Sequence, residues 1–208
     1  MSDFTVIDVE NILPSIETVK ILSIKDLFFG IEADIVFVVG RREIIEVTQK
    51  FFSLGALKIL ITNKKSAACG KFNSFVILPD DENFATTAEK IIRSLKYLID
   101  LENWEFEDIS SFLESAGETL FIIGEAENVS AAAKSAFLNA NKNKFNKCNA
   151  VLMNVSGVPD SISLFELNEV ILKIQDSITP AVEFLCEFTV DESLKNKVKI
   201  IILAMRSD

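Results

Sequence analysis

Two hydrophobic periods alternate along the first half of the chain. Short runs of β-branched and apolar residues occupy 34–39, 57–62 and 74–78, and Gly40 closes the first of them. Between the first two runs, residues 41–53 carry apolar side chains at helical spacing. Continuous apolar runs are typical of buried parallel strands, and their alternation with helices predicts crossover connections in a mainly parallel sheet.

The longest helical pattern follows these strands. Between residues 84 and 101 the apolar positions recur every three or four residues, which predicts one long central helix. The residues that define the pattern are Phe84, Ala88, Ile91, Ile92, Leu95, Leu98 and Ile99.

The middle of the chain predicts shorter elements. We expect a short helix at 109–113, a strand at 119–123 and a helix capped by Asn128. The polar, basic stretch 139–149 predicts a loop and is the segment most favourable to disorder.

The last sixty residues predict an α+β arrangement. A strand is expected at 150–155, and the spacing of Ser163 and Glu166 is that of a capping box that begins a helix running to about residue 178. Residues 182–190 alternate with a period of two, which indicates a strand with one buried face, and 198–205 predicts a final strand.

Composition narrows the classes of function. The chain has 208 residues, 49% of them hydrophobic, and a net charge of -10. The negative charge argues against nucleic acid and against direct membrane binding, because both surfaces are anionic. The sequence contains no histidine, which removes His-based triads and most zinc sites, so we expect no metal. The three cysteines, Cys69, Cys148 and Cys186, are odd in number and far apart, which favours a reducing cytoplasm.

Carboxylates are concentrated in the segment 103–109, which reads Asn-Trp-Glu-Phe-Glu-Asp-Ile and follows the long helix. The three acids of this stretch, Glu105, Glu107 and Asp108, are candidates for a functional role. They are equally well explained as a solvated loop and helix start, where acids are favourable.

The order of several segments resembles the FtsZ family and the wider tubulin-like proteins. Segment 103–109 resembles the family's catalytic loop, whose pattern is Asn-x-Asp-Phe-x-Asp-Val, and the helix at 84–101 resembles its central helix. Other matching segments are 54–64, 75–80, 124–128, 152–160, 164–169 and 190–194. The resemblance covers about residues 54 to 205, and so many segments in the same order make chance a poor explanation.

The first part of the chain departs from that family. The family's phosphate loop reads Gly-Gly-Gly-Thr-Gly-Thr-Gly and cradles GTP with backbone amides, whereas here the strand at 34–39 continues as Gly-Arg-Arg-Glu. The seven glycines are dispersed, and Asp8 and Glu10 follow the first strand where they would repel a triphosphate. We therefore expect no autonomous GTP binding, no cofactor and no enzyme activity from the isolated chain.

The resemblance also assigns candidate roles to the acidic segment. It implies that Asn103, Glu105 and Asp108 act in trans on the nucleotide of a neighbouring subunit, with Glu105 in place of an aspartate. Trp104 and Glu107 are candidate interface residues, although a Trp beside a long helix is as often part of the core. Arg41 and Arg42 are interpreted as an anion-binding pair, as surface charges, or as residues that fill the position of the lost loop.

Together these observations predict an α/β protein in three parts. Residues 1–83 form a reduced, degenerate Rossmann-like half with a parallel sheet, 84–101 the central helix, and 102–208 an α+β domain of the FtsZ C-terminal type. The expected function is that of a nucleotide-site-deficient protein that binds itself or an FtsZ-type subunit and caps or modulates polymerisation. Two alternatives remain: an activator that completes a partner's GTPase site in trans, and a nucleotide-independent structural homo-oligomer.

Overall fold

The computed structural model describes residues 4–10, 12–16, 19–23, 33–41, 57–67, 69–101, 105–114, 117–138, 145–176 and 182–206. The chain divides into two compact units, Met1–Glu118 and Thr119–Asp208. It has a mixed α/β fold, in which nine strands follow the mostly parallel order β2-β1-β3-β4-β5-β6-β9-β7-β8. This confirms the predicted fold class, whereas the three-part division at residues 83 and 101 stays a prediction.

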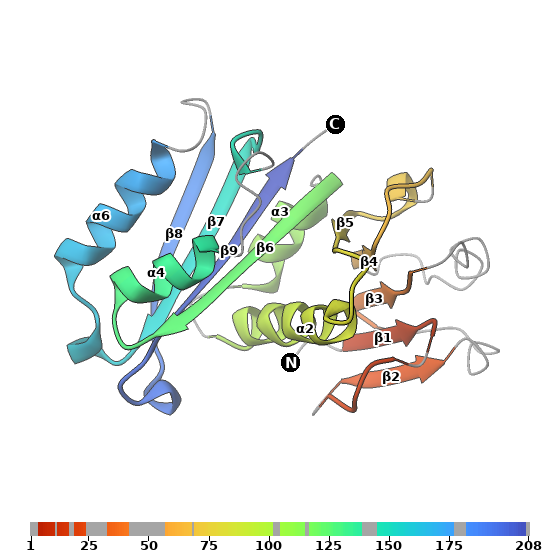
Figure 1. Cartoon of the computed structure of the whole chain (residues 1–208), viewed down its shortest axis with the longest axis horizontal. Helices are drawn as coiled ribbons and strands as arrows, with labels where there is room; N and C mark the ends of the chain where they lie inside the picture. The colour runs from red at the N-terminus through yellow and green to blue at the C-terminus, as the bar shows by residue number, and fades with distance from the viewer. Residues whose placement is uncertain are drawn as a thin grey trace. The chain divides into compact units, whose positions relative to one another are not determined.

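The first unit is built on parallel strands (Figure 1). They are β1 (Phe4–Asp8), β2 (Lys20–Ser23), β3 (Ile35–Val39), β4 (Leu57–Thr62) and β5 (Ser74–Ile77). Every residue of β1 and β3 is buried, as expected for β3 from its continuous apolar sequence. The sequence patterns did not predict β2, which has only four residues. The helix predicted at 41–53 lies outside the described residues except for Arg41.

Helix α2 (Phe84–Asp100) confirms the predicted long helix and buries its apolar face. Lys96 of α2 contacts β1, because its Nζ atom lies 5.5 Å from the centre of the Phe4 ring. The same atom lies 2.5 Å from Oδ2 of Asp100 in the last turn of the helix. Phe4 in turn stacks on Phe37 of β3. A short 3₁₀ turn, η2 (Cys69–Lys71), lies between β4 and β5.

Helix α3 (Phe106–Glu114) begins three residues before the predicted start at 109. Glu107 and Asp108 therefore lie in the first helical turn, which agrees with their interpretation as acids at a helix start, whereas the predicted start at residue 109 was wrong. The physical reason is that carboxylates near a helix N-terminus interact favourably with the helix dipole.

The second unit contains most of β6 (Gly117–Ala126) and the elements that follow. They are α4 (Val129–Leu138), β7 (Ala150–Gly157), α6 (Leu164–Gln175), β8 (Glu183–Val190) and β9 (Val198–Arg206), with 3₁₀ turns η3 (Pro159–Ser161) and η4 (Glu192–Leu194). Strand β7 pairs parallel to β8 and antiparallel to β9. Helices α4 and α6 contribute to one hydrophobic core with these strands (Figure 1).

The predicted helix caps of this unit are confirmed. Asn128 Oδ1 accepts a hydrogen bond from the Ala131 amide at 2.8 Å, and the Ser163 hydroxyl accepts one from the Glu166 amide at 3.4 Å. The prediction of disorder at 139–149 was wrong for its last part, because Phe145 and Cys148 are buried in the core of the unit. Residues 139–144 lie outside the described part of the chain.

Helix α4 approaches β6 at Gly124, where no side chain fits. A Cβ atom at this position would lie 2.1 Å from the Ala132 carbonyl oxygen and 2.6 Å from the Ala136 amide nitrogen. Both are backbone atoms, so the helix itself would have to move. We predict that Gly124→Ala lowers the free energy of unfolding by about 3 kcal/mol, measured by urea denaturation of the full chain.

Gly70→Ala is the matched control, because nothing lies within 4 Å of a Cβ atom at that position. Its expected effect is within about 0.5 kcal/mol of zero. Equal effects of the two substitutions would contradict the close approach of α4 to β6.

Candidate functional site

The carboxyl ends of β1, β3, β4 and β5 meet at one edge of the first unit, because all four strands are parallel. This is the edge at which open parallel sheets usually bind ligands. The last residue of β1, Asp8, lies there, and the residues that follow the strands are Val9 and Glu10, Gly40 and Arg41, Asn63 to Lys65, and Leu78 to Asp80.

Asp8, the last residue of β1, is buried, with 2% of its surface exposed. Its Oδ2 atom accepts a hydrogen bond from the Leu13 amide at 2.7 Å, and its Oδ1 atom accepts one from the Glu10 amide at 3.2 Å. A buried carboxylate needs such donors. Asp8 therefore holds the turn after β1 closed against the strand end.

Glu10 forms a two-pronged contact with Arg41. Its Oε1 atom accepts a hydrogen bond from the Arg41 backbone amide at 2.7 Å, and its Oε2 atom accepts one from the Arg41 Nε atom at 3.2 Å. Both carboxylate oxygens are thus occupied by donors of a single residue. The contact links the ends of β1 and β3 by a charge-assisted pair.

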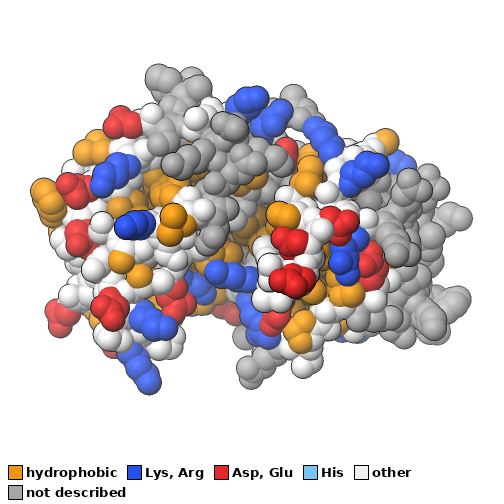
Figure 2. All heavy atoms as spheres, viewed as in Figure 1, with side chains coloured by type: hydrophobic (Ala, Val, Ile, Leu, Met, Phe, Trp, Pro, Cys, Tyr) orange, Lys and Arg blue, Asp and Glu red, His pale blue; other side chains and the backbone are white. Residues whose placement is uncertain are grey.

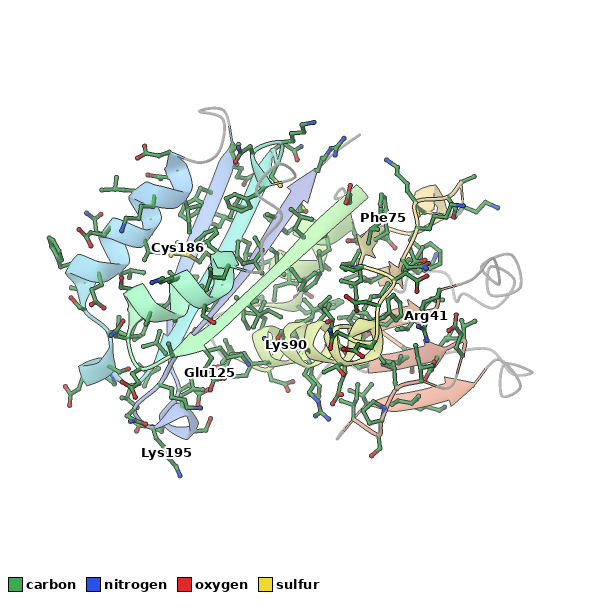
Figure 3. All side chains as sticks on the ribbon, in the orientation of Figure 1. Arg41, Phe75, Lys90, Glu125, Cys186 and Lys195 are labelled. Carbon is green, nitrogen blue, oxygen red and sulfur yellow. The ribbon has the colours of Figure 1, made fainter. Side chains whose placement is uncertain are left out.

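Two further side chains hold the guanidinium of Arg41. Its Cζ atom lies 5.5 Å from the centre of the Phe84 ring, which favours a cation over the aromatic face. Its Nη1 atom lies 3.9 Å from Oδ1 of Asp80, in the connection between β5 and α2. Figure 3 shows Arg41 beside the first-unit strands, at the end from which this connection leads into α2.

The backbone amides at the strand ends are also used internally. The Val9 amide donates to the Val39 carbonyl at 3.0 Å, and the Gly40 amide donates to the Ile61 carbonyl at 3.1 Å. A Cβ atom on Gly40 would lie 3.0 Å from the Val9 Cβ atom, which shows how closely the two strand ends approach. At this edge, the amides of Val9, Glu10, Leu13, Gly40, Arg41 and Leu78 all donate to protein acceptors.

The acidic segment lies elsewhere in the same unit. Glu105, Glu107 and Asp108 are exposed at the start of α3, where the Glu105 carbonyl accepts hydrogen bonds from the Asp108 and Ile109 amides. Asn103 and Trp104, which the sequence assigned to the same segment, lie outside the described residues. The predicted roles of all five residues stay predictions.

Helix α2 separates the two groups of charges. Phe84 at its beginning touches Arg41, whereas Asp100 at its end leads toward Glu105. A helix of 17 residues is about 25 Å long at 1.5 Å per residue. Along the chain, the strand-end cluster thus lies at the beginning of this helix, and the acidic start of α3 follows its end.

Other sites offer less chemistry. Within the described ranges, no group of three or more His, Cys, Asp or Glu side chains is placed to hold a metal ion. Cys69 and Cys148 are buried, and burial together with neighbouring Glu187 raises the pKa of the half-buried Cys186 thiol to about 11 (Figure 3). No helix in the described part is long and apolar enough to cross a membrane.

Comparisons with known proteins agree on one family, although no protein-family model matches the chain. Over 144 residues it is 25% identical to cell division protein FtsZ 1 of Halobacterium salinarum, which is 63% of this chain and 35% of that protein. The structure is similar to CetZ from Methanosaeta thermophila, with a TM-score of 0.71, 10% identity and coverage of 100% of this chain and 88% of that one. It is also similar to an FtsZ dimer from M. jannaschii, with a TM-score of 0.66, 15% identity and coverage of 99% and 88%.

The chain is FtsZ/tubulin-like. This confirms the resemblance drawn from the sequence motifs. The FtsZ-like chain spans about a third of the length of the curated relatives it matches. The names of these relatives refer to cell division. The activity and partners of the present chain are addressed below as proposals.

Sequence reasoning missed the contact between Glu10 and Arg41, although one signal for it exists. The parallel register pairs Asp8 with Val39, so the positions two residues further along each strand face one another. Glu10 and Arg41 each lie two residues after a pair of opposed strand residues and carry opposite charges, which predicts an ion pair between them. Recognising it requires knowing that β1 and β3 are neighbours, which the patterns alone do not establish.

The role of Asp8 can be measured by removing its acceptors. Asp8→Ala leaves the amides of Glu10 and Leu13 without their partner in a partly buried place, so we predict a loss of about 2 to 4 kcal/mol in the free energy of unfolding. Asp8→Asn retains one acceptor oxygen and should lose clearly less. Chemical denaturation of both variants provides the comparison, and an unchanged midpoint for Asp8→Ala would show that the turn does not depend on this carboxylate.

Proposed function

We propose that this FtsZ-like chain is an interaction protein without a nucleotide site of its own. It binds a second copy or an FtsZ-type subunit and caps or modulates polymerisation. The observation that carries the proposal is the state of the strand-end edge. There the backbone amides already donate to protein acceptors, and the Asp8 and Glu10 carboxylates lie where phosphate charge would have to be accommodated.

Similarity to FtsZ, taken alone, favours the opposite conclusion, namely that the chain binds GTP. The resemblance to FtsZ implies a GTP-binding pocket, and a related chain would bind GTP by default. A triphosphate, however, needs amide donors or glycine-lined space, and this sequence has no glycine cluster. Placing phosphates beside Asp8 and Glu10 would add like-charge repulsion to the loss of existing hydrogen bonds. The carboxylates at the strand ends and the lack of a glycine cluster therefore oppose GTP binding in spite of the resemblance.

Self-association or binding to a relative is the class of interaction that the comparisons favour. One of the similar structures is an FtsZ dimer from M. jannaschii. In the present chain, the exposed carboxylates of Glu105, Glu107 and Asp108 offer a polar contact surface at the start of α3. A subunit with only one competent face can join a polymer end without extending it through the same contact.

Nucleotide binding and polymer modulation provide the first test. Isothermal titration of the purified chain with GTP and magnesium is expected to give no binding heat. Added to assembling FtsZ, such as that of M. jannaschii, the chain should lower the light-scattering plateau in proportion to its concentration. GTP binding by the chain alone would overturn the proposal, and unchanged assembly would remove the FtsZ-type partner.

Self-association can be measured separately with the same purified protein. Light scattering of the chain alone, over a range of concentrations with and without GTP, detects the homo-oligomer. A polymer that forms equally in both conditions would favour the structural alternative, in which nucleotide has no part.

A second candidate function is activation of a partner's GTPase in trans. The exposure of both Glu105 and Asp108 favours it, because such acids can position a water molecule at a neighbour's terminal phosphate. We predict that Glu105→Gln combined with Asp108→Asn abolishes any stimulation of GTP hydrolysis by the partner, measured as phosphate release.

The control for that variant changes the same number of charges elsewhere. Glu82→Gln combined with Glu114→Gln removes two exposed carboxylates outside the start of α3 and should leave stimulation intact. Equal loss in both double variants would attribute the effect to net charge, and stimulation retained after the first pair would exclude the in-trans role.

A further inference from the structure

We propose that Arg41 is the centre of a latent anion-binding site that Glu10 keeps occupied as an intramolecular ligand. The site would take a phosphate-type oxyanion once the Glu10 carboxylate is removed. The inference rests on the proposed function, since it names the group that closes the strand-end edge, and it adds that the edge retains the donors to bind an anion.

The geometry of the Glu10 contact is that of a bound anion. Its two carboxylate oxygens are held separately, one by the Arg41 backbone amide at 2.7 Å and the other by Nε of the same residue at 3.2 Å. A backbone amide and a guanidinium that converge on two oxygens of one group form a common arrangement for carboxylate and phosphate recognition. The chain supplies that group from its own β1 end.

The Arg41 donors are positioned without Glu10 as well. The Phe84 ring lies under the guanidinium at 5.5 Å, and Asp80 lies 3.9 Å from Nη1. The Arg41 backbone amide follows β3 directly after Gly40, and the Gly40 amide donates to the Ile61 carbonyl of β4. Shortening Glu10 therefore removes the ligand and leaves its donors in place.

Access to the site is compatible with a small ion. The Arg41 side chain is 35% exposed and the Glu10 side chain 17% exposed, so Glu10 covers the donors while one side of the arginine faces solvent. An ion from solution reaches the same donors when the side chain at position 10 ends at Cβ. In the natural chain, the tethered carboxylate outcompetes a free ion because its effective concentration is high.

The surrounding acids limit the affinity. Buried Asp8 accepts the amide of Glu10 itself, and Asp80 borders the guanidinium, so both place negative charge near the site. Like charges weaken the binding of any anion. The expected ligand is thus a compact oxyanion bound in the millimolar range, on the order of weak single-site binders.

The experiment compares Glu10→Ala with the natural chain, using sodium pyrophosphate as the probe in buffer free of divalent ions and other oxyanions. Titration followed by protein NMR should show saturable shifts for the variant, with affinity at least tenfold above that of the natural chain. Glu82→Ala is the matched control, since it removes one exposed carboxylate from the β5–α2 connection and leaves Glu10 in place. It should bind no better than the natural chain.

The second variant assigns the binding to Arg41. Glu10→Ala combined with Arg41→Ala should lose the pyrophosphate response. If Glu10→Ala does not fold, as judged by its circular dichroism, Glu10→Gln retains the side-chain volume without the charge and should show a smaller gain. No gain in either folded variant, or an equal gain in Glu82→Ala, would overturn the proposal.

The outcomes separate this inference from the proposed function. GTP binding by the natural chain contradicts the proposed function directly. Absence of GTP binding by the natural chain together with absence of pyrophosphate binding by Glu10→Ala contradicts only the latent site.

Discussion

Parallel register between β1 and β3 is the constraint on which the candidate site depends. It pairs Asp8 with Val39 and brings the following residues, Val9 with Gly40 and Glu10 with Arg41, opposite each other. The Val9 amide closes the strand ends by donating to the Val39 carbonyl, and Glu10 and Arg41 close them with opposite charges. A shift of register by one residue would separate the charges and reverse the faces of every buried side chain in β3.

This arrangement uses a general property of parallel sheets in an unusual way. The carboxyl edge of such a sheet presents backbone amides and is suited to anions. In this FtsZ-like chain, carboxylates of the protein itself take up those donors, Asp8 inside the turn and Glu10 at Arg41. The amides of Glu10, Leu13 and Arg41 thus already have acceptors within the protein. A phosphate would have to displace these carboxylates before it could accept hydrogen bonds from the same amides.

The second unit depends on a different constraint, which is close packing of helix α4. The absence of a side chain at Gly124 allows the backbone near Ala132 and Ala136 to approach β6. The small residues of α4 then join the branched residues of β7 and β9 in one core. Helix α6 covers the same core with Val170 and Ile174 but exposes Leu164 and Phe165, and Figure 2 shows apolar side chains at the surface over this helix.

The amino-acid sequence by itself determined the strands at 35–39 and 57–62, the long helix, and the caps at Asn128 and Ser163, because each depends on local periodicity or local hydrogen bonding. Its ordered motifs also predicted the likeness to FtsZ. Tertiary structure alone decided that Phe145 enters a core and that Glu10 meets Arg41. These outcomes depend on contacts between residues distant in the chain, and hydrophobic pattern does not specify which strand lies beside which.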